Sequence, residues 1–487
     1  MEKEKNKAKS PRKPKLHHAV ITFAILIGVM AVAIIVYGVD VHVPMFIGVI
    51  AAACMALYLG YSWDFIEKAM MGGIYNALQA IIILAIVGIL VGIWIVGGIV
   101  PAMIYYGLKL LSPSVFLIAA LLICSITSLA TGTAWGTMST MGLALMGIAV
   151  GLGIPTPMAA GAIISGAYFG DKMSPLSDTT NLAPAMAGTD VFTHVKFMIM
   201  PTAIAYGISL IVFAILGISY ARSGQAADMS AVDAMSDGLA AQFNINPVLL
   251  IPPLIVIVSV ALKVPAIPGI TLGIISGGII GMIFQGDSAS LGVLLDAGMN
   301  GYVSETGVES IDSLLTSGGI MNMMYSISLT MIAMMFGGIM EETKQLDIVV
   351  SKILRIAKKP STLVVTTEAT CILSNAVMPE QYISIVVPGR MYAETYKEMG
   401  LHPKTLSNAL ESAGTVTSAL IPWNTCGVFI LATLGVSTFD YFPYAIFNLA
   451  MPIIVALMAF LGLTVADKDG RRLTGKAQAK RQANSVG

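Results

Sequence analysis

The feature that most constrains this chain is a series of long apolar stretches, each able to cross the hydrocarbon core of a bilayer. A membrane-spanning helix takes about 20 apolar residues. Ten stretches reach that range, at 17–38, 43–60, 74–98, 157–186, 190–219, 246–262, 267–284, 318–340, 404–434 and 440–465. Only 11% of the residues are charged, whereas a soluble domain carries about a quarter, so an ordinary water-soluble enzyme is excluded. The chain is therefore predicted to be an all-α, multi-pass membrane protein.

Charge is distributed unevenly along the chain. Two basic tails, 1–16 and 466–487, flank the apolar region, and the segment 341–360 is also basic. The loops 220–245 and 285–317 are acidic and together contain a single Arg. Because basic segments stay on the cytoplasmic side, both termini are predicted to be cytoplasmic and the 220–245 linker to be external. Two termini on the same side require an even number of crossings, and ten crossings meet this requirement. The 27 Lys and Arg balance the 27 Asp and Glu, which argues against a nucleic-acid partner.

The chain also contains an internal repeat. A shift of 246 residues places Gly72-Gly73-Ile74-Tyr75-Asn76 on Gly318-Gly319-Ile320-Met321-Asn322 and Gly92 on Gly338. The two halves, 17–219 and 246–465, would each cross the membrane five times, and this odd number turns the second half upside down. Inverted repeats with interrupted helices at matching positions indicate a secondary transporter with a site near the midplane. A duplicated channel or structural membrane protein is the alternative.

Two further apolar segments, 113–152 and 360–398, are interrupted by polar residues and predict re-entrant hairpins. Irregular backbone at membrane depth is tolerated only where protein or a water-filled cavity surrounds it. Hydroxyls and carbonyls at such tips suit a small hard cation such as Na⁺. The alternative is a continuous helix whose hydroxyls bond to its own carbonyls. The polar candidates in these tips are Ser128, Thr131, Thr133, Ser374, Asn375 and Glu380.

The stretch 157–186 is predicted to be a broken helix, because Pro175 removes a helix bond within a cluster of ionisable residues. Charged side chains at membrane depth must face a cavity or pair with one another. Ordinary helix capping is the competing interpretation. The candidate binding residues here are Asp171, Lys172, Ser174, Ser177, Asp178, Thr179 and Asn181. The equivalent broken helix in the second half, 404–434, contributes Glu411, Asn424 and Thr425.

The sequence GAIISGAYFGDKMSPLSDTTNLAP at 161–184, together with SLATGTAWGT at 128–137, closely resembles the NhaC family of Na⁺/H⁺ antiporters. That family is grouped with sodium-coupled dicarboxylate carriers. The resemblance implies inverted repeats, paired hairpins, an elevator-like transport domain that moves against a dimeric scaffold, and no cofactor besides the transported Na⁺ and H⁺. The hairpin tips depart from the Ser-Asn-Thr pattern of those carriers, since Ala376 replaces the threonine.

For function, the resemblance implies that Na⁺ and H⁺ compete for intramembrane carboxylates. Asp178 or Asp171 would carry the proton, with Lys172 as counter-charge. The implied Na⁺ ligands are Asp178, Asp171, Ser128, Thr131, Ser374 and Asn375. The alternative is a sodium- or proton-coupled carrier of a small organic anion such as malate or lactate, or of an amino acid. A membrane enzyme is not expected, because no nucleophile motif or zinc spacing accompanies the five His residues.

Overall fold

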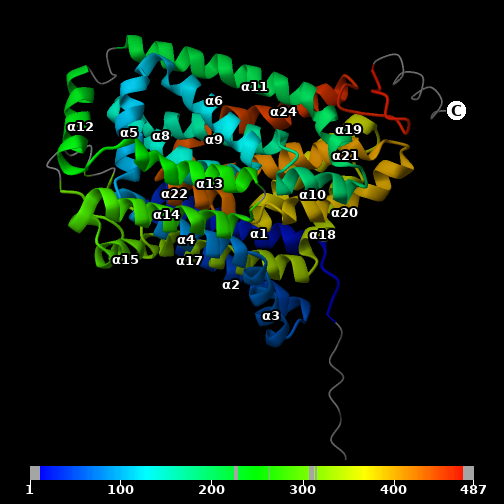
Figure 1. The fold of residues 1–487 in the computed structure, drawn as a ribbon. Helices are drawn as coiled ribbons and strands as arrows, with labels where there is room; N and C mark the ends of the chain where they lie inside the picture. Colours follow the sequence, from blue (N-terminus) through cyan, green and yellow to red (C-terminus); the bar gives the residue numbers. More distant parts are fainter. Residues whose placement is uncertain (1–10, 224–228, 263, 306–311, 313–314, 475–487) are drawn as a thin grey trace, which may run out of the picture.

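The computed structural model describes residues 11–223, 229–262, 264–305, 312 and 315–474 (Figure 1). Throughout these residues the chain is helical, and its only β pairings are isolated bridges such as that between Tyr302 and Ser317. Seven of the described helices are long and apolar enough to cross a membrane, or up to ten if each bent pair is one span. The prediction of an all-α, multi-pass protein is confirmed. Residues 1–10 and 475–487 of the predicted basic tails lie outside the described residues.

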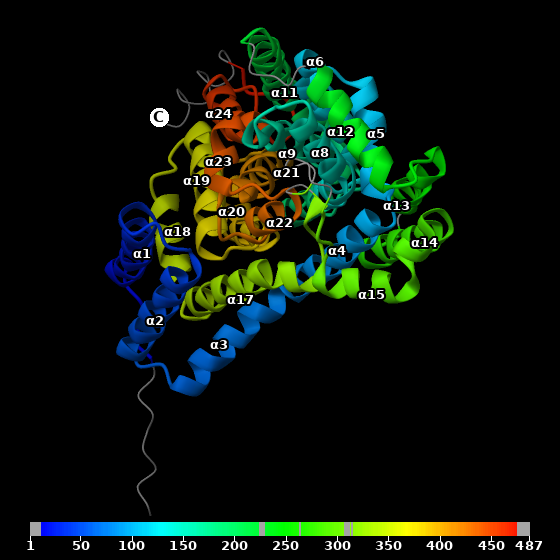
Figure 2. The ribbon, with the colours of Figure 1, turned by 90° about the vertical axis from the view of Figure 1, so that its left-hand side faces the viewer.

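One group of helices forms a layer along one side of the molecule (Figure 2). We call this group the layer. Its members are α1 (Leu16–Ala31), α2 (His42–Leu59), α3 (Trp63–Asn76), α4 (Leu78–Val96), α13 (Ile251–Ala261), α14 (Ala266–Gln285), α15 (Leu291–Asn300) and α17 (Ile320–Glu342). Helix α4 is apolar around its whole circumference, which is typical of a helix enclosed by neighbours. It packs against α14, α15 and α17, and its Trp94 indole donates to the Gly273 carbonyl at 3.0 Å.

Glycines bring the backbones of α3, α4 and α17 into direct contact. A Cβ added at Gly73 would lie 2.0 Å from the Met334 carbonyl oxygen and 3.1 Å from the Cα of Gly338. At the other end of α17, the Gly319 amide donates to the Gly88 carbonyl at 2.7 Å, and a Cβ at Gly92 would lie 3.3 Å from the Gly319 nitrogen. No side chain fits at these positions, so the layer depends on glycine at both ends of the α17 contact.

The remaining long helices form a bundle above the layer in Figure 2. The bundle consists of α6 (Pro113–Thr131), α7 (Ala134–Thr137), α8 (Leu143–Gly151), α9 (Thr156–Met173), α10 (Asp178–Ala187), α11 (Val191–Arg222), α19 (Pro360–Val377), α20 (Ile383–Glu398), α21 (Pro403–Leu410), α22 (Thr425–Leu434), α23 (Thr438–Tyr441) and α24 (Ile446–Phe460). Helix α6 packs against α9 and α11, while α19 packs against α20, α21 and α24. Across the two halves, α11 packs against α24, and α10 packs against α20 and α21, so the halves of the chain are interleaved.

Several elements depart from the sequence-based expectation. Two short helices, α5 (Ile99–Leu110) and α18 (Gln345–Leu354), follow directly on α4 and α17 and connect the layer to the bundle. The predicted linker 220–245 contains a helix, α12 (Met229–Gln242), and a sharp bend of 98° separates its main part from the helical segment Pro247–Ser259. Helix α5, with 12 residues, is too short for a search for membrane-length apolar runs, and α12 and α18 mix polar and apolar residues, so the search misses these three helices. The segment Pro247–Ser259 lies within the predicted span 246–262.

Both predicted broken helices are interrupted. Helix α9 ends at Met173 and α10 begins at Asp178, while a π-helical turn (Glu411–Thr415) and a 3₁₀ turn separate α21 from α22. The two halves of the second broken helix differ in direction by 48°. Pro175 explains the first break, because proline has no N–H to continue the helical ladder.

Candidate functional site

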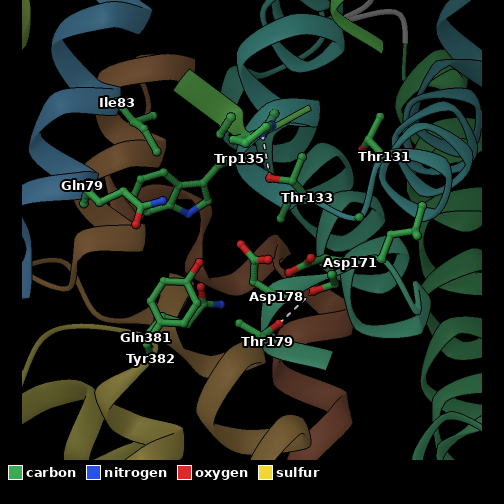
Figure 3. A pocket seen from close by; sticks show the side chains of 18 of the residues that line it. Gln79, Ile83, Thr131, Thr133, Trp135, Asp171, Asp178, Thr179, Gln381 and Tyr382 are labelled. Atoms are coloured by element: carbon green, nitrogen blue, oxygen red, sulfur yellow. Dashed lines mark hydrogen bonds between the residues drawn. The ribbon is translucent and has the colours of Figure 1, made fainter. Parts of the chain in front are cut away.

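A cavity of about 520 Å³ lies where the bundle meets the layer (Figure 3). On the bundle side it is lined by the turn between α6 and α7, the turn between α19 and α20, and the break between α9 and α10. The layer contributes Asn76, Gln79 and Ile83 around the start of α4, together with residues of α13 and α14. Three irregular segments from distant parts of the sequence therefore meet at one polar space.

The α9–α10 break is held open by side-chain bonds to its own backbone. Thr180 Oγ1 donates to the carbonyls of Asp171 and Lys172, both at 3.1 Å, which satisfies acceptors left free at the end of α9. Ser177 begins α10, because its Oγ accepts from the Thr180 amide at 3.4 Å. Asn181 Nδ2 donates to the Pro175 carbonyl at 2.9 Å. The polar residues of this motif thus fix an unwound backbone beside the cavity.

The first hairpin tip packs directly on this break. Ser174 Oγ donates to the Leu129 carbonyl at 2.8 Å. Gly132 has a φ of +71°, and a Cβ there would lie 2.7 Å from the Leu176 carbonyl carbon. After this glycine, Thr133 begins α7 by accepting from the Gly136 amide at 3.2 Å. Thr131 lines the cavity, and its buried Oγ1 has no hydrogen-bond partner among the described residues.

The second hairpin turns later than its polar sequence indicated. Ser374 and Asn375 belong to the last turn of α19, and the irregular segment is Met378–Tyr382. Glu380 lies in this irregular segment, and its Oε2 accepts from the amide of Ile383, the first residue of α20, at 3.0 Å. Asn375 instead holds the broken helices together: its Nδ2 donates to the Gly414 carbonyl at 2.8 Å, and its Oδ1 accepts from Asn424 at 3.1 Å.

The structure brings eight of the predicted site residues to the cavity wall. They are Thr131, Thr133, Asp171, Ser177, Asp178, Thr179, Asn181 and Glu380. The carboxyl groups of Asp171 and Asp178 interact electrostatically, and both point into the space drawn in Figure 3. Two acidic groups at one polar cavity form an environment suited to a cation.

The other predicted residues lie behind the wall. Ser128 donates to the Ala167 carbonyl at 2.6 Å, and Thr425 donates through its amide to the Pro379 carbonyl at 2.9 Å. Lys172, immediately after Asp171, points away from the cavity: its Nζ donates to Ser412 Oγ at 3.1 Å and to the sulfur of Met198 at 3.2 Å. The further predicted residues that do not line the cavity are Ser174, Ser374, Asn375, Glu411 and Asn424.

Sequence reasoning missed several amide and aromatic residues of the cavity. Gln381 and Tyr382 follow Glu380 at the second tip, and the Trp135 ring stacks on Phe429 with centroids 4.2 Å apart. Gln79 comes from α4, within an apolar stretch that the prediction treated as uniform. The signal in the sequence that could have indicated Gln79 is its amide side chain, which stands just before a run of three isoleucines.

The apolar helices, and a cavity among them with two carboxyl groups on its wall, are the features of an α-helical membrane transporter. The sequence pattern of the Na⁺/H⁺ antiporter family matches residues 166–463. The chain is 38% identical to the Na⁺/H⁺ antiporter NhaC of Alkalihalophilus pseudofirmus, over 91% of this chain and 95% of that protein. It is also 37% identical to the malate-2H⁺/Na⁺-lactate antiporter of Bacillus subtilis, over 90% and 92%. The arginine/ornithine antiporter ArcD of Halobacterium salinarum is 34% identical, over 94% of both chains.

The chain belongs to the Na⁺/H⁺ antiporter family. The family resemblance of the 161–184 motif is thereby confirmed. Its relatives are named as antiporters, so the protein is a transporter and not an enzyme, as the composition indicated.

Proposed function

We propose that this protein exchanges Na⁺ for H⁺ by alternating access, with Asp171 and Asp178 as the carboxylates for which the two ions compete. The observation that carries the proposal is the position of both carboxyl groups on the wall of one cavity, at the break between two helices. A carboxylate that binds either a cation or a proton, and never both, couples the two ions without further machinery. No cofactor is needed for this exchange.

The remaining Na⁺ ligands would be oxygen atoms close to these carboxyl groups. Thr131, Thr133 and Ser177 line the same cavity, and the hydroxyl of Thr131 has no hydrogen-bond partner within the part of the chain that the structure describes. In this proposal Ser128, Ser374 and Asn375 do not bind Na⁺ directly. They hold the hairpin tips in place. The implied set of six Na⁺ ligands is thus reduced to Asp171, Asp178 and Thr131.

Alternating access would follow from an inverted repeat. Adding 246 to the bounds of α6, Pro113–Thr131, gives 359–377, and α19 spans Pro360–Val377. Adding 246 to α10, Asp178–Ala187, gives 424–433, and α22 spans Thr425–Leu434. The same shift converts the Gly73–Gly338 contact into the contact between Gly319 and Gly92. These relations support two halves of like fold, with the layer as scaffold and the bundle as an elevator-like transport domain.

The orientation follows from the basic segments. With both termini in the cytoplasm, the beginnings of α4 and α14 lie on the cytoplasmic side, and Asn76, Val264 and Pro265 at these ends line the cavity. The structure would then represent an inward-facing state. A homodimer joined through the layer is part of the proposal, because the related carriers use such a scaffold.

The test is transport by purified protein in liposomes that contain a pH-sensitive dye. A Na⁺ gradient should change the internal pH without any organic solute, and Asp178→Asn should abolish the change. Asp64→Asn, an exposed position on α3, is the matched control and should exchange at the wild-type rate. Near-normal exchange by Asp178→Asn would contradict the assignment.

A second candidate is exchange of a small organic anion or amino acid. The cavity of about 520 Å³ is far larger than a cation requires and lies in the range of small-molecule sites. Gln79, Gln381 and Trp135 offer amide and aromatic contacts on its wall. Two relatives are named for malate and lactate or for arginine and ornithine. A pH change that requires added malate, lactate or amino acid in the same liposomes would favour this function.

A further inference from the structure

A second group of ionisable side chains is buried behind the cavity wall. It consists of Lys172 on α9, His194 on α11, Glu368 on α19 and Glu411 on the π-helical turn after α21. At most 3% of each residue is exposed. Lys172 interacts electrostatically with Glu411 and Glu368, and His194 interacts with Lys172. We call these four residues the buried cluster.

The buried cluster has more hydrogen-bonding capacity than it uses. Among the described residues, His194 Nε2, Glu368 Oε1 and Glu411 Oε2 have no hydrogen-bond partner. The Lys172 ammonium donates to the Ser412 hydroxyl at 3.1 Å and not to a carboxylate. A buried charge without direct partners is costly, and evolution retains such groups mainly where function requires them.

Charge balance indicates what the buried cluster holds. Two ionised carboxylates against one ammonium leave a net charge of −1 in a region of low dielectric, and such an uncompensated charge is strongly unfavourable. One bound proton, on Glu368, Glu411 or His194, makes the cluster neutral. Cys371 and Tyr396, which also interact with Glu368, are neutral in their ordinary protonated forms and leave this balance unchanged.

The buried cluster is connected to the cavity in two ways. Thr179 Oγ1 donates to Glu411 Oε1 at 3.3 Å and also lies 3.1 Å from Ser177 Oγ on the cavity wall. Asp171 interacts electrostatically with both Glu411 and Asp178. A positive charge that arrives beside Asp171 and Asp178 therefore acts on the cluster through Asp171 and disfavours its extra proton.

We propose that Lys172, Glu411, Glu368 and His194 form a proton-binding site separate from the cation-binding cavity, and that Na⁺ binding in the cavity expels the proton from this site. The proposal rests on Na⁺/H⁺ exchange as the function. For each Na⁺ bound, one H⁺ leaves the buried cluster, in addition to any proton that Na⁺ displaces from Asp171 or Asp178. The bond that breaks is the O–H or N–H bond of the protonated group, and the proton passes to water.

His194 marks the exit. It lies in the first turn of α11, and its Nδ1 is 2.8 Å from Ser407 Oγ, which donates to the Lys404 carbonyl at 3.1 Å. Lys404 lies at the start of α21 and contacts Gly470 of the C-terminal segment. This end of the bundle is the one assigned to the cytoplasm, so the polar chain leads from Glu411 toward the cytoplasmic surface.

The experiment measures protons and Na⁺ on the same purified protein in detergent. Na⁺ is added to weakly buffered protein with a pH-sensitive dye, with choline as the reference cation, and ²²Na⁺ binding is measured in parallel. Wild-type protein should release protons when Na⁺ binds. Glu368→Gln makes the cluster neutral without the extra proton, so it should bind Na⁺ within about threefold of wild type and release about one proton fewer.

Glu398→Gln, an exposed carboxylate on α20, is the matched control and should behave like wild type in both measurements. Unchanged proton release by Glu368→Gln would overturn the proposal, as would loss of ²²Na⁺ binding by folded Glu368→Gln. If Glu368→Gln does not fold, infrared difference spectra of wild-type protein decide the matter. Besides the band of the cavity carboxylates Asp171 and Asp178, Na⁺ should remove a second protonated-carboxyl band that Glu411→Gln lacks, and this second band in Glu411→Gln would refute the cluster.

Liposome transport distinguishes this proposal from the proposed function. Wild-type protein that releases protons in detergent but shows no Na⁺-driven pH change in liposomes would refute the exchange function and leave the buried cluster in place. Normal coupled exchange by Glu368→Gln, with the wild-type pH profile, would refute the cluster and leave the exchange function in place.

Discussion

The glycine contact between α3 and α17 gives a prediction whose size follows from the structure. At Gly73 a methyl group would lie 2.0 Å from the Met334 carbonyl oxygen, an atom fixed by its helix. The neighbouring Gly72 lies on the same helix with nothing within 4 Å of the added methyl. Gly73→Ala and Gly72→Ala therefore make the same chemical change one residue apart, in a crowded and in an open position.

The two variants should change stability in opposite directions. An alanine within a helix is favoured over glycine by about 0.5–1 kcal/mol, which is the whole effect expected for Gly72→Ala. Overpacking a close contact costs about 1–3 kcal/mol, and backbone at 2.0 Å places Gly73→Ala at the upper end. The net loss at Gly73 is then about 2 kcal/mol, and the two variants should differ by about 3 kcal/mol.

The measurement is unfolding of the purified proteins in mixed detergent micelles, followed by tryptophan fluorescence against added denaturing detergent. Gly338→Ala, whose methyl would meet the Ala69 carbonyl oxygen at 2.2 Å, should lose as much stability as Gly73→Ala. If Gly73→Ala unfolds at the same denaturant as Gly72→Ala, the close packing of α3 on α17 described here is wrong.

Two more predictions concern the interior of the bundle. Lys172→Met leaves Glu368 and Glu411 without their cation and should cost about 3–5 kcal/mol, with further loss as the pH rises because the folded state then binds more protons than the unfolded state. Adding Glu411→Gln should restore part of that stability, and an unfolding midpoint as low as that of Lys172→Met would count against the pairing. Asn424→Ala removes the cap on the Cys426 amide and the bonds to Asn375, and should cost about 2 kcal/mol in the same assay. Asn424→Ser, whose hydroxyl can accept from the same amide, should lose less.

The sequence predicts the interruptions of this fold better than it predicts the direction of its side chains. Pro175 and the polar run around it predict the α9–α10 break, because a helix cannot continue through proline. Asp171 and Lys172 were assigned to one site on the same grounds. Successive helical residues point about 100° apart, so Asp171 faces the cavity while Lys172 faces the buried cluster. Which of these two side chains reaches the cavity depends on how α9 packs among its neighbours, and the local sequence does not show this.

The sequence also does not show in which direction a hydroxyl side chain points. Thr131 and Ser128 both lie in the last turns of α6, yet the first reaches the cavity and the second bonds to α9. Local sequence is nearly the same for the two. The sequence predicts no role for the five His residues, because no nucleophile motif or zinc spacing accompanies them, and His194 lies in the first turn of α11. Its burial against Ser407 depends on a contact 213 residues away in sequence.

Helix α11 has a consequence for the surrounding lipid. Between Lys196 and Arg222 it contains 25 uncharged residues, or roughly 38 Å of helix at 1.5 Å per residue, against about 30 Å of hydrocarbon. A mismatch of this size is accommodated by tilting. Because α11 packs on α6, α9 and α24, its tilt is transmitted to the body that lines the cavity. Bilayer thickness therefore acts as a mechanical load on the bundle, which is the part that the proposed function expects to move.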